Sequence, residues 1–191
     1  LKNLNIQRLA KIAAEGYTIL SPIPSCTLMF KQELPLLFPN DSNVVEVGKA
    51  FRDPFEYFRA RAKDGLFKTE FAKGAGNVSY HISCHLRVQN GGQKTREILE
   101  MLPDTTLNTV ERCSGHAGTW GVKKEFHEMS LKIGKPVFRK MGIHPNGKNE
   151  KPDVIASDCQ LATHHIEEGI GQHEDSKIKH PLTILADAYE L

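Results

Sequence analysis

Three stretches of this sequence look like β-strands, and each of them runs into a cysteine. They are VSYHISCHL (78–86), TLNTVERC (106–113) and PDVIASDC (152–159), which deliver Cys84, Cys113 and Cys159. Helical patterns lie between and after these stretches, over 95–102, 122–141 and 160–169. Because strands that alternate with helices form parallel sheets, the pattern predicts an α/β fold.

The positions of the three cysteines carry a functional implication. Parallel α/β sheets bind ligands beyond the carboxyl ends of their strands. We therefore expect Cys84, Cys113 and Cys159 to meet at one edge of the sheet.

The helical segments have recognisable boundaries. Thr95 is a candidate N-cap for REILEML, which Pro103 would stop, and Gly169 is a candidate C-terminus for QLATHHIEEG. The long middle helix has apolar residues spaced by three or four, and Gly134 and Pro136 are expected to bend it. A polar loop, GIHPNGKNEK, is predicted at 142–151.

The chain also repeats itself once. Residues 17–30 (YTILSPIPSCTLMF) echo 152–165 (PDVIASDCQLATHH), which pairs Cys26 with Cys159. The prediction is therefore two pseudo-repeated units with parallel-type βαβ sheets, of which the N-terminal unit is truncated. Its expected bounds are 1–65 for the C-terminal half of a first unit, 66–77 for a linker and 78–191 for a second domain.

The segment ERCSGHAGTWG (111–121) places a cysteine and a histidine among three glycines. Thiolates are strong ligands for iron and zinc, and glycines such as Gly115 and Gly118 let backbone N–H groups approach the sulfur atoms. His116 and His164 follow Cys113 and Cys159 by a few residues, so they are candidate nitrogen ligands. The helices that start after these cysteines would direct partial positive charge at the thiols.

Composition excludes several classes of protein. The formal charge of +2 is spread along the chain, so nothing indicates a nucleic-acid partner. No apolar run approaches the roughly 20 residues of a membrane span, and the first residues lack a secretory signal. The four cysteines are too few and too dispersed for a disulfide scaffold, so a cytoplasmic location is expected.

The order of these motifs resembles a known family. SYHISCHLRVQ, ERCSGHAGTWGVKKEFHEMSLKIGKPVF, PDVIASDCQLATHHIEEGIG and KHPLTILADAY together resemble the cysteine-rich CCG domain of the heterodisulfide reductase B chain. They are particularly similar to the version in the group formed by the anaerobic glycerol-3-phosphate dehydrogenase C chain and the iron-sulfur component of glycolate oxidase. The N-terminal IPSCTLMFKQELPLLFP resembles the end of a preceding CCG domain.

The resemblance implies an iron-sulfur cluster, either a four-iron four-sulfur cluster or a variant of it. Cys84, Cys113 and Cys159 match family ligands, and Cys26 matches the same position in the half-domain. Two of the five expected thiols are missing, because Ser114 and Ala162 stand in their places. His116 or His164 are candidates to replace them.

The function that the resemblance implies is an electron-transfer module or subunit of a heterodisulfide-reductase-like or glycerol-3-phosphate-dehydrogenase-like oxidoreductase. Its partners would be a flavoprotein dehydrogenase or other oxidoreductase subunits, and it would be peripheral to a complex at the inner membrane. Two alternatives remain open. Cysteine and histidine ligands would also suit zinc in a structural or interaction module, and Cys113 with His116 would suit a thiol enzyme.

Overall fold

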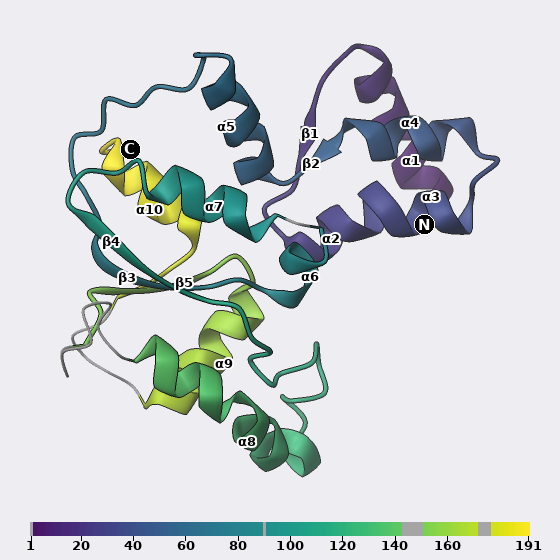
Figure 1. The fold of residues 1–191 in the computed structure, drawn as a ribbon. Helices are drawn as coiled ribbons and strands as arrows, with labels where there is room; N and C mark the ends of the chain where they lie inside the picture. Colours follow the sequence, from purple (N-terminus) through teal and green to yellow (C-terminus); the bar gives the residue numbers. More distant parts are fainter. Residues whose placement is uncertain (1, 90, 143–150, 172–176) are drawn as a thin grey trace.

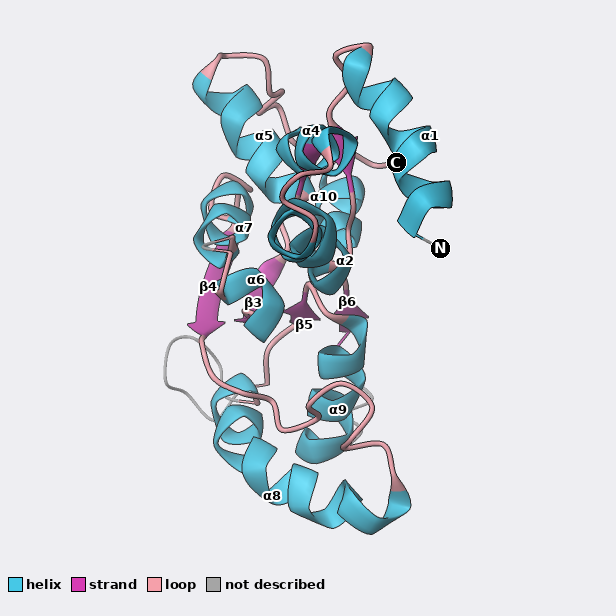
Figure 2. Cartoon of the chain, turned by 90° about the vertical axis from the view of Figure 1, so that its right-hand side faces the viewer, coloured by secondary structure: helices cyan, strands magenta, loops and turns pink. Residues whose placement is uncertain are grey.

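The computed structural model describes residues 2–89, 91–142, 151–171 and 177–191, and its centre is a parallel sheet. The sheet has the strand order β4-β3-β5-β6, and every pairing in it is parallel (Figure 2). Its strands are β3 (Gly76–His81), β4 (Thr105–Val110), β5 (Val154–Ser157) and β6 (Lys177–Lys179).

Helices cover both faces of this sheet, as all-parallel sheets require (Figure 1). One face carries α5 (Pro54–Lys63), α7 (Gly92–Leu99) and α10 (Pro181–Ala188). The other face carries α8 (Lys124–Met141) and α9 (Gln160–Ile170). The predicted α/β fold class is therefore confirmed.

Side chains of β3 and β5 alternate between two cores, because successive residues of a strand point to opposite faces. Val78 and Tyr80 belong to the core beneath α5, α7 and α10, together with Phe55. Ile155 belongs to the opposite core, with Phe138 and other residues of α8 and α9. By the same alternation His81, which follows Tyr80, faces the α8 and α9 side of the sheet.

The N-terminal region forms a smaller unit with its own core. Its sheet consists of two short parallel strands, β1 (Ile19–Leu20) and β2 (Phe51–Arg52). Ile6, Val44, Val47 and Phe51 form the core of this unit. Its helices are α1 (Lys2–Ala14), α2 (Pro24–Leu28), the π-helical segment η1 (Met29–Glu33), α3 (Leu34–Leu37) and α4 (Ser42–Ala50).

The predicted repeat is visible in the geometry of helix starts. The residue before α2, Ile23, and the residue before α9, Cys159, both have φ −105° and ψ 110°. Thr27 and Thr163 lie four residues further on, and each hydroxyl donates to the carbonyl of that N-cap residue, at 3.4 and 3.0 Å. The two units therefore share the same strand-to-helix turn.

This equivalence corrects the sequence alignment of the repeat. The matched turn pairs Ile23 with Cys159 and Thr27 with Thr163, so Cys26 is equivalent to Ala162 rather than to Cys159. The sequence alignment paired the apolar residues of the two segments in the wrong register. A short run of apolar residues contains too little alternation to fix the register of a strand. Each unit thus has one cysteine of a Cys-x-x-Cys pair. Cys26 occupies the second position of the pair in its unit, and Cys159 occupies the first position in the other.

Several predicted helix boundaries were wrong. Helix α7 begins at Gly92, so Thr95 lies inside it rather than at its N-cap, and α9 continues past Gly169 to Ile170. Helix α8 continues through Gly134 and Pro136 to Met141, and Val122 lies before its first residue. Two of the apolar residues in its spacing of three or four, Met129 and Ile133, are 53% and 46% exposed.

Other expectations concern segments that the structure describes only in part. The predicted polar loop at 142–151 lies largely outside the described residues. The domain bounds stay predictions, although Phe55 of α5 packs in the same core as Val78 of β3. Within the described ranges, no helix has both the length and the apolar character needed to cross a bilayer.

Candidate metal-binding site

The three predicted cysteines all lie just beyond the carboxyl ends of the strands. Strand β3 ends at His81, and Cys84 begins the short helix α6 (Cys84–Arg87). Strand β4 ends at Val110 and leads into the loop that carries Cys113, while Cys159 is the N-cap of α9. All three are free thiols, of which Cys113 is exposed.

The thiols influence one another, which shows that the strand ends bring them together. Burial raises the pKa of Cys84, and the neighbouring Cys113 and Cys159 raise it further. The expected convergence of Cys84, Cys113 and Cys159 is therefore found in the structure.

The glycine loop shapes the surroundings of Cys113. Gly115 has φ +95°, and a Cβ atom there would lie 2.2 Å from the Ser130 carbonyl oxygen. Only glycine fits this position, and its N–H donates to Cys113 Sγ at 3.4 Å. Gly118, in contrast, lies on an exposed turn where a Cβ would meet nothing within 4 Å.

His81 connects the ends of the three strands. Its Nε2–H donates to the Arg112 carbonyl at 2.7 Å, next to Cys113, which leaves Nδ1 to accept from the Ser157 hydroxyl at 3.1 Å. Ser157 Oγ in turn accepts the N–H of Cys159 at 3.4 Å. Burial lowers the pKa of His81 to about 4, so the imidazole is neutral at pH 7. His81 is a positioning residue, and both of its nitrogens are already engaged.

The two histidines proposed as replacement ligands lie in different surroundings. His116 Nδ1 is 2.8 Å from the hydroxyl of buried Ser114, so Nε2 is the nitrogen that a metal would use. Burial lowers the pKa of His116, which favours the neutral form that ligates metals. His164 lies on the exposed side of α9, with Nδ1 3.4 Å from a carboxylate oxygen of Glu167.

A pocket of about 310 Å³ lies beside the start of α9. Its lining includes Ser157, Thr163, His164 and His180. Because Ser157 also contacts the backbone of Cys159, this pocket adjoins the thiol cluster.

Cys26 approaches from the N-terminal unit. It is half-buried on α2, a helix that packs against α6, which begins at Cys84. The side-chain amide of Gln89 stabilises this contact, because it donates a hydrogen bond to the Pro24 carbonyl at 2.9 Å. The two units therefore meet at the helix that carries Cys84.

Sequence reasoning missed the buried acid next to Cys159. The Asp158 carboxylate accepts hydrogen bonds from the Tyr80 and Thr95 hydroxyls, the second at 3.3 Å. Burial raises the pKa of Asp158 to about 7. The sequence signal that could have found it is an acidic residue directly after the apolar run VIAS. A charged side chain at such a buried position is seldom without partners.

The donor set can be compared with what different metals need. A tetrahedral zinc ion with Zn–S bonds of about 2.3 Å holds its sulfur ligands about 3.8 Å apart. In the described part of the chain, only His127, His165 and Glu168 form a group of three whose donor atoms lie within 4.8 Å of one another. Within the described residues, Cys84, Cys113 and Cys159 do not form such a group. Thiolate ligands suit both iron-sulfur clusters and zinc.

Comparison with known proteins finds a family that matches the part of the chain that holds these cysteines. Residues 78–167 match the CCG family, described as a cysteine-rich domain. The C chains of the anaerobic glycerol-3-phosphate dehydrogenases of Escherichia coli strain K12 and of Escherichia coli O157:H7 are each 28% identical to this chain over 183 residues. The alignment covers 93% of this chain and 42% of each relative, so the chain spans less than half of their length. No solved structure matches the chain.

Proposed function

Because residues 78–167 carry a CCG cysteine-rich domain, we propose that this chain binds an iron-sulfur cluster and transfers electrons within an oxidoreductase. The observation that carries the proposal is the convergence of Cys84, Cys113 and Cys159 at the carboxyl end of one parallel sheet. Thiolates in such a group are the usual ligands of iron-sulfur clusters, which supply one-electron transfer.

The chain offers several candidates for a fourth ligand. His116 has a free Nε2 in the same loop as Cys113, and His164 follows on α9. Cys26 would come from the N-terminal unit, through the contact between α2 and α6. Ser114 is a weaker candidate, because its hydroxyl is already engaged by His116.

The protein also supplies groups that offset the negative charge of bound thiolates. The N–H of Gly115 donates to Cys113 Sγ, and Cys159 lies at the N-terminus of an eleven-residue helix. The partial positive charge of a helix N-terminus stabilises a nearby anion. These groups therefore offset part of the negative charge that thiolates bound to a metal would carry at Cys113 and Cys159.

The partners belong to the same proposal. The relatives are named as subunits of an anaerobic glycerol-3-phosphate dehydrogenase. By analogy, a flavoprotein dehydrogenase would supply electrons to this chain, and a quinone or a thiol-disulfide substrate would accept them. The chain would work in the cytoplasm, peripheral to an inner-membrane complex.

Cysteine variants of the full chain test the ligand assignment. Each variant is purified without oxygen, reconstituted with iron and sulfide, and its iron content is measured. We expect Cys84→Ala, Cys113→Ala and Cys159→Ala to lose most of the iron, while Thr119→Ala, an exposed change in the same loop as Cys113, retains it. Equal iron in Cys113→Ala and Thr119→Ala would contradict the assignment. Zinc bound by the cysteines in place of iron would favour the structural zinc module instead.

A further inference from the structure

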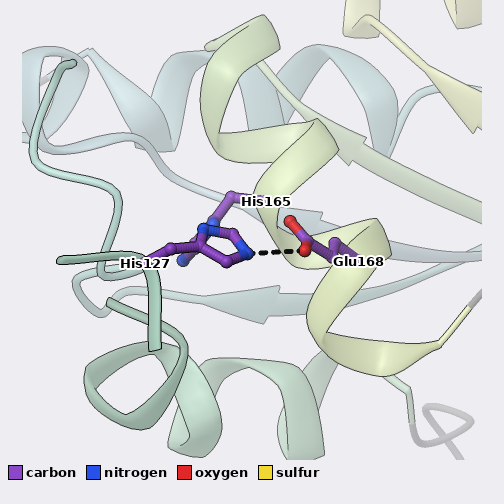
Figure 3. A group of neighbouring side chains, drawn as sticks. All are labelled: His127, His165 and Glu168. Carbon is purple, nitrogen blue, oxygen red and sulfur yellow. Dashed lines mark hydrogen bonds and ion pairs between the residues drawn. The ribbon is translucent and has the colours of Figure 1, made fainter. Parts of the chain in front are cut away.

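A second group of metal-binding side chains lies on the face of the sheet that α8 and α9 cover. His127 comes from α8, while His165 and Glu168 come from α9 (Figure 3). One donor atom of each lies within 4.8 Å of the donor atoms of the other two. None of the four cysteines belongs to this group, although His116 of the cysteine loop lies 6.3 Å from His165 between ring centroids.

His165 provides the strongest indication that the group has a ligand. The residue is 5% exposed, and its Nε2 is buried without any hydrogen-bond partner. The Phe138 ring packs edge-on against the imidazole at 5.6 Å between centroids. The imidazole is thus held in place with a buried Nε2 that has no partner.

His127 is also held in place. Its Nδ1–H donates to the Gly121 carbonyl at 2.8 Å, and its Nε2 lies 2.7 Å from Glu168 Oε1. Histidine ligands of metals commonly donate their other nitrogen to a backbone carbonyl, which fixes the tautomer and the ring. His127 therefore has Nδ1 fixed by a carbonyl and Nε2 directed at Glu168.

A simple ion pair between His127 and Glu168 does not explain the whole arrangement. It would satisfy these two side chains but would leave Nε2 of His165 without a partner. Leaving a buried polar atom unpaired is unfavourable. A cation bound to all three donor atoms satisfies every one of them.

We propose that His127, His165 and Glu168 bind a single divalent transition-metal ion. Two imidazoles and one carboxylate are a ligand set that suits Zn²⁺ and Fe²⁺, and three protein ligands leave a coordination position for water. His127 and Glu168 have side chains that are 35% and 53% exposed, so an ion can reach the site from solvent. The ion would link α8 to α9, the helices that follow Cys113 and Cys159.

Cobalt(II) is the appropriate probe, because its spectrum distinguishes nitrogen and oxygen ligands from thiolates. The full chain, with its thiol site reconstituted, is titrated with Co²⁺. We expect one equivalent to give visible d–d bands without a thiolate-to-cobalt charge-transfer band, and one equivalent of Zn²⁺ to displace it. A charge-transfer band alone would place the metal on cysteines and would overturn the proposal.

Two neighbouring glutamates provide a matched pair of variants. We expect Glu168→Gln to weaken Co²⁺ and Zn²⁺ binding by at least about tenfold, since even changes to groups that orient a ligand cost 10- to 100-fold. Glu167→Gln, the adjacent change on α9, should bind as the wild type does. His127→Gln should match Glu168→Gln, with the fold of each variant checked by circular dichroism. Equal affinities for the two glutamate variants would overturn the proposal, and the iron content of the thiol site would be unaffected by that result.

Discussion

Substitution of His81 by phenylalanine tests how much the hydrogen bonds between the three strand ends contribute to stability. Phenylalanine keeps the ring but removes the hydrogen bonds to the Arg112 carbonyl and the Ser157 hydroxyl. Leaving a buried polar group unpaired costs about 1–3 kcal/mol. Arg112 is exposed, and Ser157 still accepts the hydrogen bond from the Cys159 N–H. The lower end of this energy range therefore applies to each of the two lost hydrogen bonds. We expect His81→Phe to lower the free energy of unfolding by about 2 kcal/mol at pH 7.

The same substitution should change how stability depends on pH. Burial lowers the pKa of His81 from 6.5 to about 4, so below pH 6.5 the unfolded chain takes up a proton that the folded protein does not. The contribution of His81 to stability is therefore complete above pH 6.5 and falls as the pH decreases, by about 1.4 kcal/mol per pH unit. At pH 4.5 the wild type has lost about 2.7 kcal/mol that His81→Phe cannot lose. At pH 4.5 His81→Phe should therefore be at least as stable as the wild type, because a loss of about 2.7 kcal/mol exceeds a deficit of about 2 kcal/mol.

Urea unfolding of the anaerobic protein, followed by the fluorescence of Trp120, measures both effects at pH 7 and at pH 4.5. Trp120 is the single tryptophan and stacks on Phe126. His85→Gln, which changes an exposed histidine, is the control and should follow the wild type at both pH values. If the free energy of unfolding of His81→Phe is lower than that of the wild type by the same amount at both pH values, the assignment of a neutral, buried His81 is refuted.

Three further predictions concern other parts of the site. Gly115→Ala should destabilise the fold by several kcal/mol and reduce bound iron, whereas Gly118→Ala, with φ +64° and open space, should cost only about 1–2 kcal/mol; equal thermal shifts for the two would contradict this. Phe138→Ala should cost about 3–5 kcal/mol in urea unfolding, because it empties the space against Gly134, Gly169 and His165; a cost below about 1 kcal/mol would be inconsistent with this packing. Burial raises the pKa of Asp158 to about 7, so the wild type should lose about 4 kcal/mol of stability between pH 4 and pH 7 that Asp158→Asn does not lose; parallel pH profiles would contradict the buried acid.

The sequence was sufficient to predict the α/β fold and the meeting of three cysteines. Strand-like runs such as VIAS, separated by helical patterns, leave few arrangements other than a parallel sheet, and parallel strands end at the same edge. The cysteines themselves lie two or three residues beyond the strands rather than on their last residues. That difference reflects the turn out of the sheet, which a run of β-forming residues does not specify.

Other features depend on contacts between distant segments and were not predictable from local pattern. Thr95 looked like a helix cap, but its hydroxyl donates to Asp158, which lies 63 residues away. Cys26 was aligned with Cys159, and only the matched backbone angles at Ile23 and Cys159 revealed the correct register. His127 and Glu168 carried no motif, because their partnership arises from the packing of α8 on α9.

The iron and acid-labile sulfide content of the unmodified chain, prepared and reconstituted without oxygen, tests most directly whether it binds an iron-sulfur cluster. We expect a brown protein in which both iron and sulfide are bound in stoichiometric amounts. Zinc at the histidine and glutamate site would not affect this result. A colourless protein that binds neither iron nor sulfide after reconstitution would contradict the central claim.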